Sequence, residues 1–474
     1  MSQTQLIVDG QKSGKPRRPA LLIASTASGQ GKTTLTAALA RLHSRQGRKV
    51  RVFKCGPDFL DPYWHELASG APVHSVDLWM TGEADIRARL HAAAQEADLI
   101  LMEGVMGLFD GSPSAADLAQ LLGLPVLAVV NASAMAGTFG AVAYGLQHYQ
   151  PGLRWAGLVA NRVASSHHAE LLQQGLRDPE AWQGALAGIT LDGPQKNAAL
   201  LPERHLGLVA AHELGDAMQR LDAAADALAR TPLGQRPWTA GAGQASWQDW
   251  AVDFALPSQA AAQETAIEPW LADRTVAVAC DAAFAFIYPA NLDCLRAMGA
   301  RLAFFSPLAG DRLPHCDALW LPGGYPELHA EALQANTGLR EDLAQHVAAG
   351  KPVWAECGGM LALCESVTDT AGDTPVTQAL WGLLPGQVHM QARLAGLGMQ
   401  QLELPGGVLR GHTFHYSRLE TSMPQAGRSS RPGAAVQADR GEALYRHGSV
   451  HASYFHAWFA SCPRAVARLL GAQI

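Results

Sequence analysis

Charged side chains are scarce in this sequence. Asp, Glu, Lys and Arg make up only 16% of its 474 residues, and 36 basic against 42 acidic residues give a net charge of −6 without any block of one sign. A basic face for nucleic acid is therefore not expected. Apolar residues make up 48%, which excludes a disordered chain, and the length exceeds that of one ordinary domain.

Cysteine and unbroken apolar runs are also rare. The seven Cys include no CxxC pair and no metal-site spacing, so we expect a reducing, cytoplasmic compartment. Residues 118–147 carry no formal charge and are long enough to cross a bilayer. However, Pro125, Asn131 and Gly137 divide this stretch into a strand, a turn and a helix of small residues. It therefore predicts a buried strand–helix unit and no membrane association.

Two series of apolar strands alternate with helical stretches. The first lies at 20–24, 50–54, 98–102, 125–130 and 155–160, and the second at 275–279, 301–305, 318–321 and 352–355. This alternation predicts an α/β fold with parallel sheets covered on both faces. We place a first domain at 18–230, a linker rich in Gly, Ala, Gln, Pro and Trp at 231–272, and a second domain at 273–474.

A phosphate-binding loop follows the first strand, where Ser25-Thr-Ala-Ser-Gly-Gln-Gly-Lys-Thr33 leads into a helix. Such a loop directs backbone N–H groups at phosphates, places Lys32 on the β and γ oxygens and offers the Thr33 hydroxyl to Mg²⁺. Thr26 stands where the strict motif has its first Gly, and a strand–helix turn formed by chance is the alternative interpretation. The expected nucleotide-binding residues are Ser28, Gly29, Gly31, Lys32, Thr33 and Thr34.

Carboxylates follow the second and third strands. Lys54, Asp58 and Asp61 come after one strand, and Glu103 and Asp110 after the next. Because parallel strands end at one edge of a sheet, these groups should meet the phosphate loop, where acids bound to Mg²⁺ would not repel ATP. The alternative is that Asp58 and Asp61 only cap turns beside proline. The expected metal ligands are Thr33, Asp58 and Glu103.

Asn161 and Arg162 follow the fifth strand. The amide of an asparagine can pair with an adenine edge through its donor and its acceptor. A residue in this position can equally be part of a turn, so the signal is weak.

The second series carries a cysteine at a sharp strand-to-helix turn, in Val353-Trp-Ala-Glu-Cys357-Gly-Gly. At such an elbow the helix N-terminus is expected to lower the pKa of the thiol, and the N–H of Gly358 can face an oxyanion. A second N–H is expected from Gly324, which follows the preceding strand, and His456 is the candidate general base. The alternative is an inert core cysteine. We expect a structural or substrate-side role, and not zinc binding, for His412 and His415.

Taken together, these motifs resemble the cobyrinic or hydrogenobyrinic acid a,c-diamide synthase family over roughly residues 18 to 470. An ordered series is far more specific than any one motif. The resemblance rests on the phosphate loop and on residues 54–62, 76–80, 103–111, 161–163, 201–208, 281–289, 321–327 and 355–359.

The resemblance implies a dethiobiotin-synthetase-like ATP domain joined to a triad-type, class I-like glutamine amidotransferase domain. Cys357, with His456 as base, would release ammonia from L-glutamine. ATP and Mg²⁺ would activate the c and then the a acetate carboxylate of a corrin-ring acid as an acyl phosphate, with Lys54 on the transferred phosphoryl. Related ATP domains often pair, so a homodimer is compatible with the resemblance.

Two features depart from the family. Ser25 stands at a common Gly position, and Trp458 replaces the second His of a His-x-His pattern, which leaves the group that orients His456 open. Three competing functions are considered. The first is a ParA- or MinD-like ATPase switch, but the position of the signature Lys of those loops is occupied by Ala27 here. The others are a tetrapyrrole-binding module with a decayed glutaminase, and amidation of a nickel tetrapyrrole. The sequence does not decide between metal-free and cobalt-containing corrins.

Overall fold

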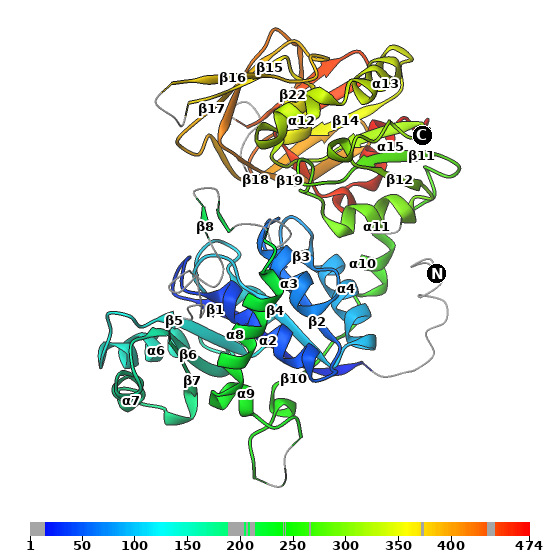
Figure 1. The fold of residues 1–474 in the computed structure, drawn as a ribbon. Coiled ribbons are helices and arrows are strands. Elements are labelled where there is room, and N and C mark those ends of the chain that lie inside the picture. The colour runs from blue at the N-terminus through cyan, green and yellow to red at the C-terminus, as the bar shows by residue number, and fades with distance from the viewer. Residues whose placement is uncertain are drawn as a thin grey trace. The chain divides into compact units, whose positions relative to one another are not determined.

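The protein is described from a computed structural model (Figure 1), which divides into two compact units, Lys12–Glu264 and Thr265–Ile474. The structure describes residues 15–187, 203–204, 207–208, 214–239, 241, 243–264, 267–370, 374–433 and 441–474. Half of the expected motif at 201–208 lies outside these residues; what is described there is a pair of short strands, β8 (Glu203–Arg204) and β9 (Gly207–Leu208).

The first unit contains the expected parallel sheet, and all five predicted strands are present. In spatial order its strands are β3 (His74–Val76), β2 (Val50–Cys55), β4 (Leu99–Glu103), β1 (Arg17–Ser25), β5 (Val126–Asn131), β6 (Trp155–Val163) and β7 (Trp182–Ala187). Every neighbouring pair in this order is parallel. The carboxyl ends of these strands therefore share one edge.

Helices cover both faces of this sheet (Figure 1). They are α2 (Lys32–Arg45), α3 (Asp61–Ser69), α4 (Glu83–Glu96), α5 (Ala115–Leu122), α6 (Thr138–His148), α7 (Ser166–Gln174), α8 (Ala217–Ala229) and α9 (Pro232–Gln235). Successive residues of β1 enter different cores, since Leu22 packs in one apolar cluster and Leu21 and Ile23 pack in the other. Burial on both faces explains why this strand is apolar from Pro19 to Ala24, without alternation.

Much of the segment expected to be a linker packs into the first unit. Strand β10 (Ala251–Asp253) pairs antiparallel with β1, and Trp247 and Trp250 are buried in the core that contains α2 and α8. Helix α10 (Gln259–Glu264) follows, while Leu271 is already buried in the second unit. Trp247 and Trp250 thus serve as core residues of the first unit.

The second unit is built on a mixed sheet. Its spatial order is β12 (Arg301–Phe305), β11 (Thr275–Ala279), β13 (Ala318–Leu321), β14 (Val353–Glu356), β23 (Val450–Ser453), β22 (Ala443–His447) and β21 (Gln425–Arg428). The strands from β12 to β23 are parallel, as predicted for the first four, and the remaining two are antiparallel. The helices are α11 (Pro289–Ala297), α12 (Ala330–Ala335), α13 (Thr337–Ala348), α14 (Gly358–Leu363) and α15 (Pro463–Leu469).

Two smaller sheets complete this unit. One consists of β16 (Val376–Ala379), β15 (Ser366–Asp369), β17 (Gln387–Met390) and β20 (Ser417–Glu420), and the other of β18 (Gly396–Leu404), β19 (Gly407–His415) and β24 (His456–Ala457). The second of them matters for function because it carries His456.

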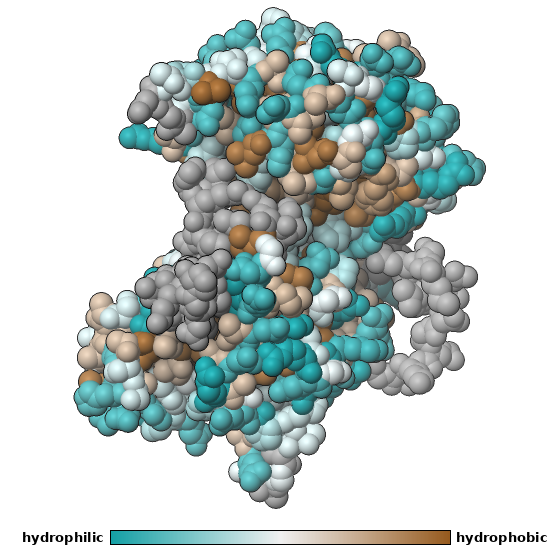
Figure 2. Space-filling view, in the orientation of Figure 1, coloured by the Kyte–Doolittle hydropathy of each residue, from teal (hydrophilic) through white to brown (hydrophobic). Residues whose placement is uncertain are grey.

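Apolar and polar residues are interspersed on the visible surface of each unit (Figure 2). Large apolar residues such as Leu256 and Tyr149 are exposed individually. Among the described residues, no helix is long and apolar enough to span a bilayer.

Candidate functional site

The predicted phosphate loop connects β1 to α2. Gly31, the residue before the helix, has φ 103°, and a methyl group on its Cα would lie 2.2 Å from Nδ2 of Asn161. Both constraints favour glycine here. The ammonium of Lys32 is nearly buried and donates to Ser25 Oγ (2.9 Å), Ala27 O (3.1 Å) and Met106 O (2.6 Å). Burial lowers the pKa of Lys32.

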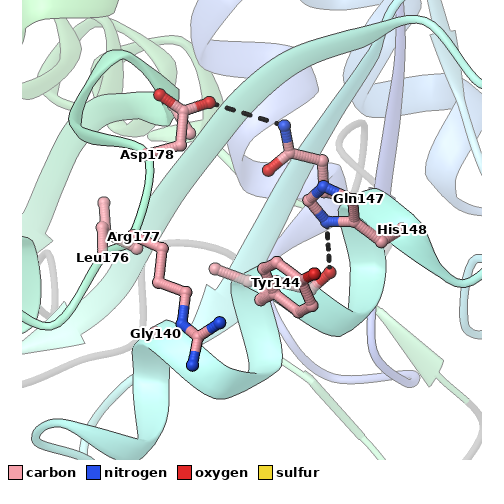
Figure 3. Close-up of a pocket in the computed structure, with 9 residues that line it drawn as sticks. Gly140, Tyr144, Gln147, His148, Leu176, Arg177 and Asp178 are labelled. Carbon is pink, nitrogen blue, oxygen red and sulfur yellow. Dashed lines mark hydrogen bonds between the residues drawn. The ribbon is translucent and has the colours of Figure 1, made fainter.

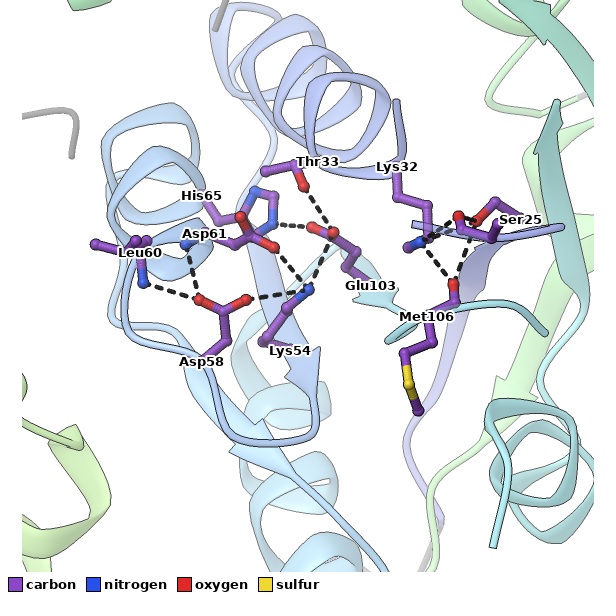
Figure 4. A network of polar contacts seen from close by, with 11 residues as sticks. Ser25, Lys32, Thr33, Lys54, Asp58, Leu60, Asp61, His65, Glu103 and Met106 are labelled. Carbon is purple, nitrogen blue, oxygen red and sulfur yellow. Dashed lines mark hydrogen bonds and ion pairs between the residues drawn. The ribbon is translucent and has the colours of Figure 1, made fainter. Parts of the chain in front are cut away.

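Lys54 lies at the centre of the acidic cluster (Figure 4). It pairs directly with Glu103 in the register of β2 and β4, which brings together residues far apart in the sequence. Lys54 Nζ is 2.7 Å from Asp61 Oδ2, 3.1 Å from Glu103 Oε1 and 3.6 Å from Asp58 Oδ2. Burial alone would lower the pKa of Lys54, but these carboxylates outweigh it and raise that pKa well above its ordinary value. The lysine is therefore held charged inside the protein.

Glu103 is fully buried and satisfied by three donors. Its Oε1 accepts from Thr33 Oγ1 (2.8 Å) and Lys54 Nζ (3.1 Å), and its Oε2 contacts Nε2 of His65. Burial acts to raise the pKa of this carboxyl, but Lys54, His65 and Thr33 hold it below its usual range. Glu103 thus remains ionised.

His65 belongs to this site but is absent from the sequence-based prediction. It is fully buried in α3, four residues after Asp61. That spacing places two residues on one face of a helix, and it is the signal that could have identified His65. The ring nitrogen Nδ1 has no hydrogen-bond partner among the described residues.

Two of the predicted acids form turns in this structure. Asp58 Oδ1 accepts the N–H groups of Leu60 (2.8 Å) and Asp61 (3.1 Å), and Asp110 Oδ2 accepts the N–H of Gly107 (2.7 Å). Burial and the neighbouring Asp61 carboxylate raise the pKa of Asp58. Asp58 still reaches Lys54, whereas Asp110 caps its own loop.

The carboxylate and hydroxyl oxygens of this site are the kind of ligand that Mg²⁺ prefers. Within the described ranges no group of three His, Cys, Asp or Glu side chains has the geometry of a preformed metal site. Magnesium is usually held by one or two carboxylates together with phosphates and water. The hydroxyl of Thr33 beside the Glu103 carboxylate matches that pattern.

Asn161 lies against the phosphate loop. Its Nδ2 donates to Gln30 O (2.9 Å), and its Oδ1 accepts the N–H of Arg162 (2.9 Å), which has a φ of 58°. These contacts place both residues beside the nucleotide loop. Recognition of an adenine edge by Asn161 stays a prediction.

The predicted elbow cysteine lies at one edge of the second sheet. Cys357 joins β14 to α14 with φ 44° and ψ −110°, and its N–H donates to Ser453 O (2.7 Å) at the end of β23. A methyl group on Gly358 would lie 2.7 Å from the backbone N of Gly324, and one on Gly323 would lie 2.4 Å from Cε1 of His456. The predicted nucleophile, the oxyanion glycines and the candidate base therefore meet where β13, β14 and β23 end.

The pKa of the Cys357 thiol differs from the expectation based on the sequence. Cys357 is buried, and desolvation followed by the charge of Glu327 raises the pKa of its thiol, against the lowering effect of the Gly358 N–H. The expected lowering of the thiol pKa is therefore wrong for the resting protein, because burial outweighs the helix N-terminus. Burial, His412 and His415 lower the pKa of His456 well below its ordinary value. The resting pair is a thiol and a neutral imidazole.

His412 and His415 both lie beside the glutaminase site on β19. His412 is the cross-strand partner of His456, and the two rings stack with centroids 4.9 Å apart. His415 Nε2 is 3.1 Å from Glu442 Oε1, and its ring stacks on that of Tyr454 at 3.7 Å. His412 therefore contacts the candidate base directly, whereas His415 contacts Glu442 and Tyr454.

A separate cavity of about 300 Å³ lies beside α6 (Figure 3). Gln147 reaches Asp178 there (3.4 Å), and the Arg177 guanidinium lies 5.2 Å from the centre of the Tyr144 ring. None of its lining residues belongs to the phosphate loop, the acidic cluster or the elbow.

Comparison with known families agrees with this architecture. Residues 21–192 match the CobQ/CobB/MinD/ParA nucleotide binding domain, and residues 275–463 match the CobB/CobQ-like glutamine amidotransferase domain. Fold and sites thus define a glutamine-dependent amidoligase, in which a nucleotide-binding domain is joined to an amidotransferase domain.

Similar proteins extend over almost the whole chain. Hydrogenobyrinate a,c-diamide synthase of Stutzerimonas stutzeri is 54% identical over 95% of this chain and 98% of its own length, and that of Pseudomonas aeruginosa is 52% identical over 96% and 98%. Cobyrinate a,c-diamide synthase of Herminiimonas arsenicoxydans is 46% identical over 96% and 97%. The chain belongs to the family of hydrogenobyrinate and cobyrinate a,c-diamide synthases.

Proposed function

We propose that this chain uses ATP and glutamine to amidate the a and c acetate carboxylates of hydrogenobyrinic acid in cobalamin biosynthesis. The observation that carries the proposal is the similarity over 95% of the chain to a hydrogenobyrinate a,c-diamide synthase. The phosphate loop and the elbow cysteine of the two units supply the chemistry it requires. Cobyrinic acid is the second candidate, because the relative that is 46% identical is named for it.

The second unit would supply ammonia. As Cys357 Sγ attacks the glutamine carboxamide, the thiol proton passes to the neutral imidazole of His456, and the N–H groups of Gly324 and Gly358 face the developing oxyanion. His456 then protonates the leaving nitrogen, and water hydrolyses the thioester to glutamate. A neutral base is needed for the first step, and the lowered pKa of His456 supports this role.

The first unit would activate the acid. The loop residues Ser28, Gly29, Gly31, Lys32, Thr33 and Thr34 are proposed to bind phosphate, and Thr33 and Glu103, with Asp58, to hold Mg²⁺, which when bound neutralises phosphate charge. The substrate carboxylate attacks the γ-phosphorus, ADP leaves, and ammonia displaces phosphate from the acyl phosphate. Lys54 would balance the charge of the transferred phosphoryl. Asp61 holds Lys54 in place.

The remaining predicted residues have narrower proposed roles. Asp110 would shape the loop after β4, since it caps the N–H of Gly107. Asn161 and Arg162 would border the adenine, because Asn161 contacts the phosphate loop.

Mass spectrometry of the products tests the proposal. The protein is incubated with ATP, Mg²⁺ and glutamine and with hydrogenobyrinic, cobyrinic or a nickel-tetrapyrrole acid in turn. We expect the metal-free acid to gain two amides, and omission of ATP to abolish the gain. ATP hydrolysis without any amidated product would instead favour an ATPase switch.

Two further properties follow from the proposed function. We propose a cytoplasmic location, which the seven free cysteines support. A homodimer is proposed from the behaviour of related ATP domains, and sedimentation analysis of the full chain tests it.

A further inference from the structure

Strand β24, which carries His456, is held by two buried side chains from other elements. The N–H of Ala457 donates to Glu356 Oε1 at 3.3 Å, and the carbonyl of Ala457 accepts from Asn291 Nδ2 at 2.8 Å. Asn291 Oδ1 also accepts the N–H of Phe459 at 2.8 Å. Glu356 and Asn291 are each only 1% exposed. The N–H and the carbonyl group of Ala457, the residue after His456, are therefore both held by hydrogen bonds.

Glu356 links the nucleophile to this strand. It is the residue before Cys357, at the end of β14, and Trp354 Nε1 donates to its Oε1 at 2.6 Å. Asn291 comes from α11, on another part of the unit. The residue two positions after His456 is Trp458, whose side chain is not an acid. Besides its backbone pairing with β19, β24 is thus held by side chains from β14 and α11.

We propose that Glu356 and Asn291 are positioning residues of the glutaminase reaction, which clamp Ala457 and thereby aim the imidazole of His456 at Cys357. The inference rests on the proposed function and deepens it. A general base must lie within hydrogen-bond reach of the proton it removes. Displacement of β24 by a fraction of a bond length would weaken proton transfer, while glutamine would still bind.

Hydrolysis of glutamine by the full chain tests this, together with the pH profile of Cys357 alkylation by iodoacetamide. For Glu356→Leu we expect kcat to fall about tenfold or more with KM within about twofold, because only the base is misplaced. Glu356→Gln keeps the acceptor oxygen and should restore kcat to within about threefold of the parent. The alkylation profile of Glu356→Leu should move to higher pH.

Asn291→Ala is the second variant, and it should show the same loss of kcat if Glu356→Leu does not fold. Ser429→Ala is the matched control, since Ser429 is equally buried and its hydroxyl, among the described residues, bonds Gln400 and the N–H of Glu442 but no residue of β24. An unchanged kcat in both Glu356→Leu and Asn291→Ala, or a Gln variant as impaired as the Leu variant, would overturn the inference. Cys357→Ser serves as the reference: retained hydrolysis there would refute the proposed function itself.

Discussion

Replacing Glu356 by Gln should change how the stability of the second unit depends on pH. The Glu356 carboxyl is fully buried, and desolvation raises its pKa from 4.5 to about 8, despite hydrogen bonds from Trp354 and Ala457. It is therefore protonated in the folded protein at neutral pH and ionised in the unfolded chain. Glutamine has the same shape and a carbonyl oxygen, but it does not titrate.

The magnitude follows from linkage. Between pH 4.5 and 8 the folded state binds one more proton than the unfolded state, so stability falls as pH rises through this window. Each pH unit corresponds to about 1.4 kcal/mol. From pH 5 to pH 8 the free energy of unfolding should therefore fall by about 3–4 kcal/mol through Glu356, and Glu356→Gln should lack this loss.

Urea denaturation of the full chain at pH 5, 6, 7 and 8, followed by tryptophan fluorescence, measures the effect. Trp320, Trp354 and Trp381 are buried in the second unit and report on its unfolding. The other titrating groups are common to the parent and the variant, so the difference between the two curves isolates Glu356. Parallel curves would refute the reasoning, because a carboxyl group that is ionised in both the folded and the unfolded state does not titrate between pH 5 and pH 8.

Three further predictions concern the two sites. Cys357→Ser should abolish amidation from glutamine but leave amidation from added ammonia, and loss of both in a folded variant would contradict separate sites. Glu103→Gln should reduce ATP-dependent amidation at least about tenfold while glutamine hydrolysis persists, and unchanged synthesis would exclude a metal role for Glu103. Lys54→Met should lower the free energy of unfolding by about 3–5 kcal/mol, because it leaves buried carboxylates without a counter-charge, and thermal denaturation within about 1 °C of the parent would refute this.

The regular elements were readable from the sequence. Runs such as residues 20–24 and 275–279 are short and apolar and lie between helical stretches, and burial on both faces requires that composition. The packing of segment 231–272 into the first unit could not be predicted from the sequence, because its tryptophans follow no helical or strand periodicity. Trp247 and Trp250 fill a core whose other side comes from α2 and α8, so only tertiary packing gives them a role.

The candidate sites divide in the same way. The loop before Lys32 and the elbow at Cys357 are local motifs, since backbone turns of this kind depend on residues adjacent in sequence. By itself the sequence therefore determined the α/β class and the two chemistries of the family, together with the local motifs proposed to perform them. The tertiary structure alone decided that Lys54 is enclosed by acids, that His65 contacts Glu103, that the Cys357 thiol is protonated at rest, and that Glu356 and Asn291 hold the strand of His456. These properties depend on desolvation and on distances between strands, which arise only when distant segments pack together.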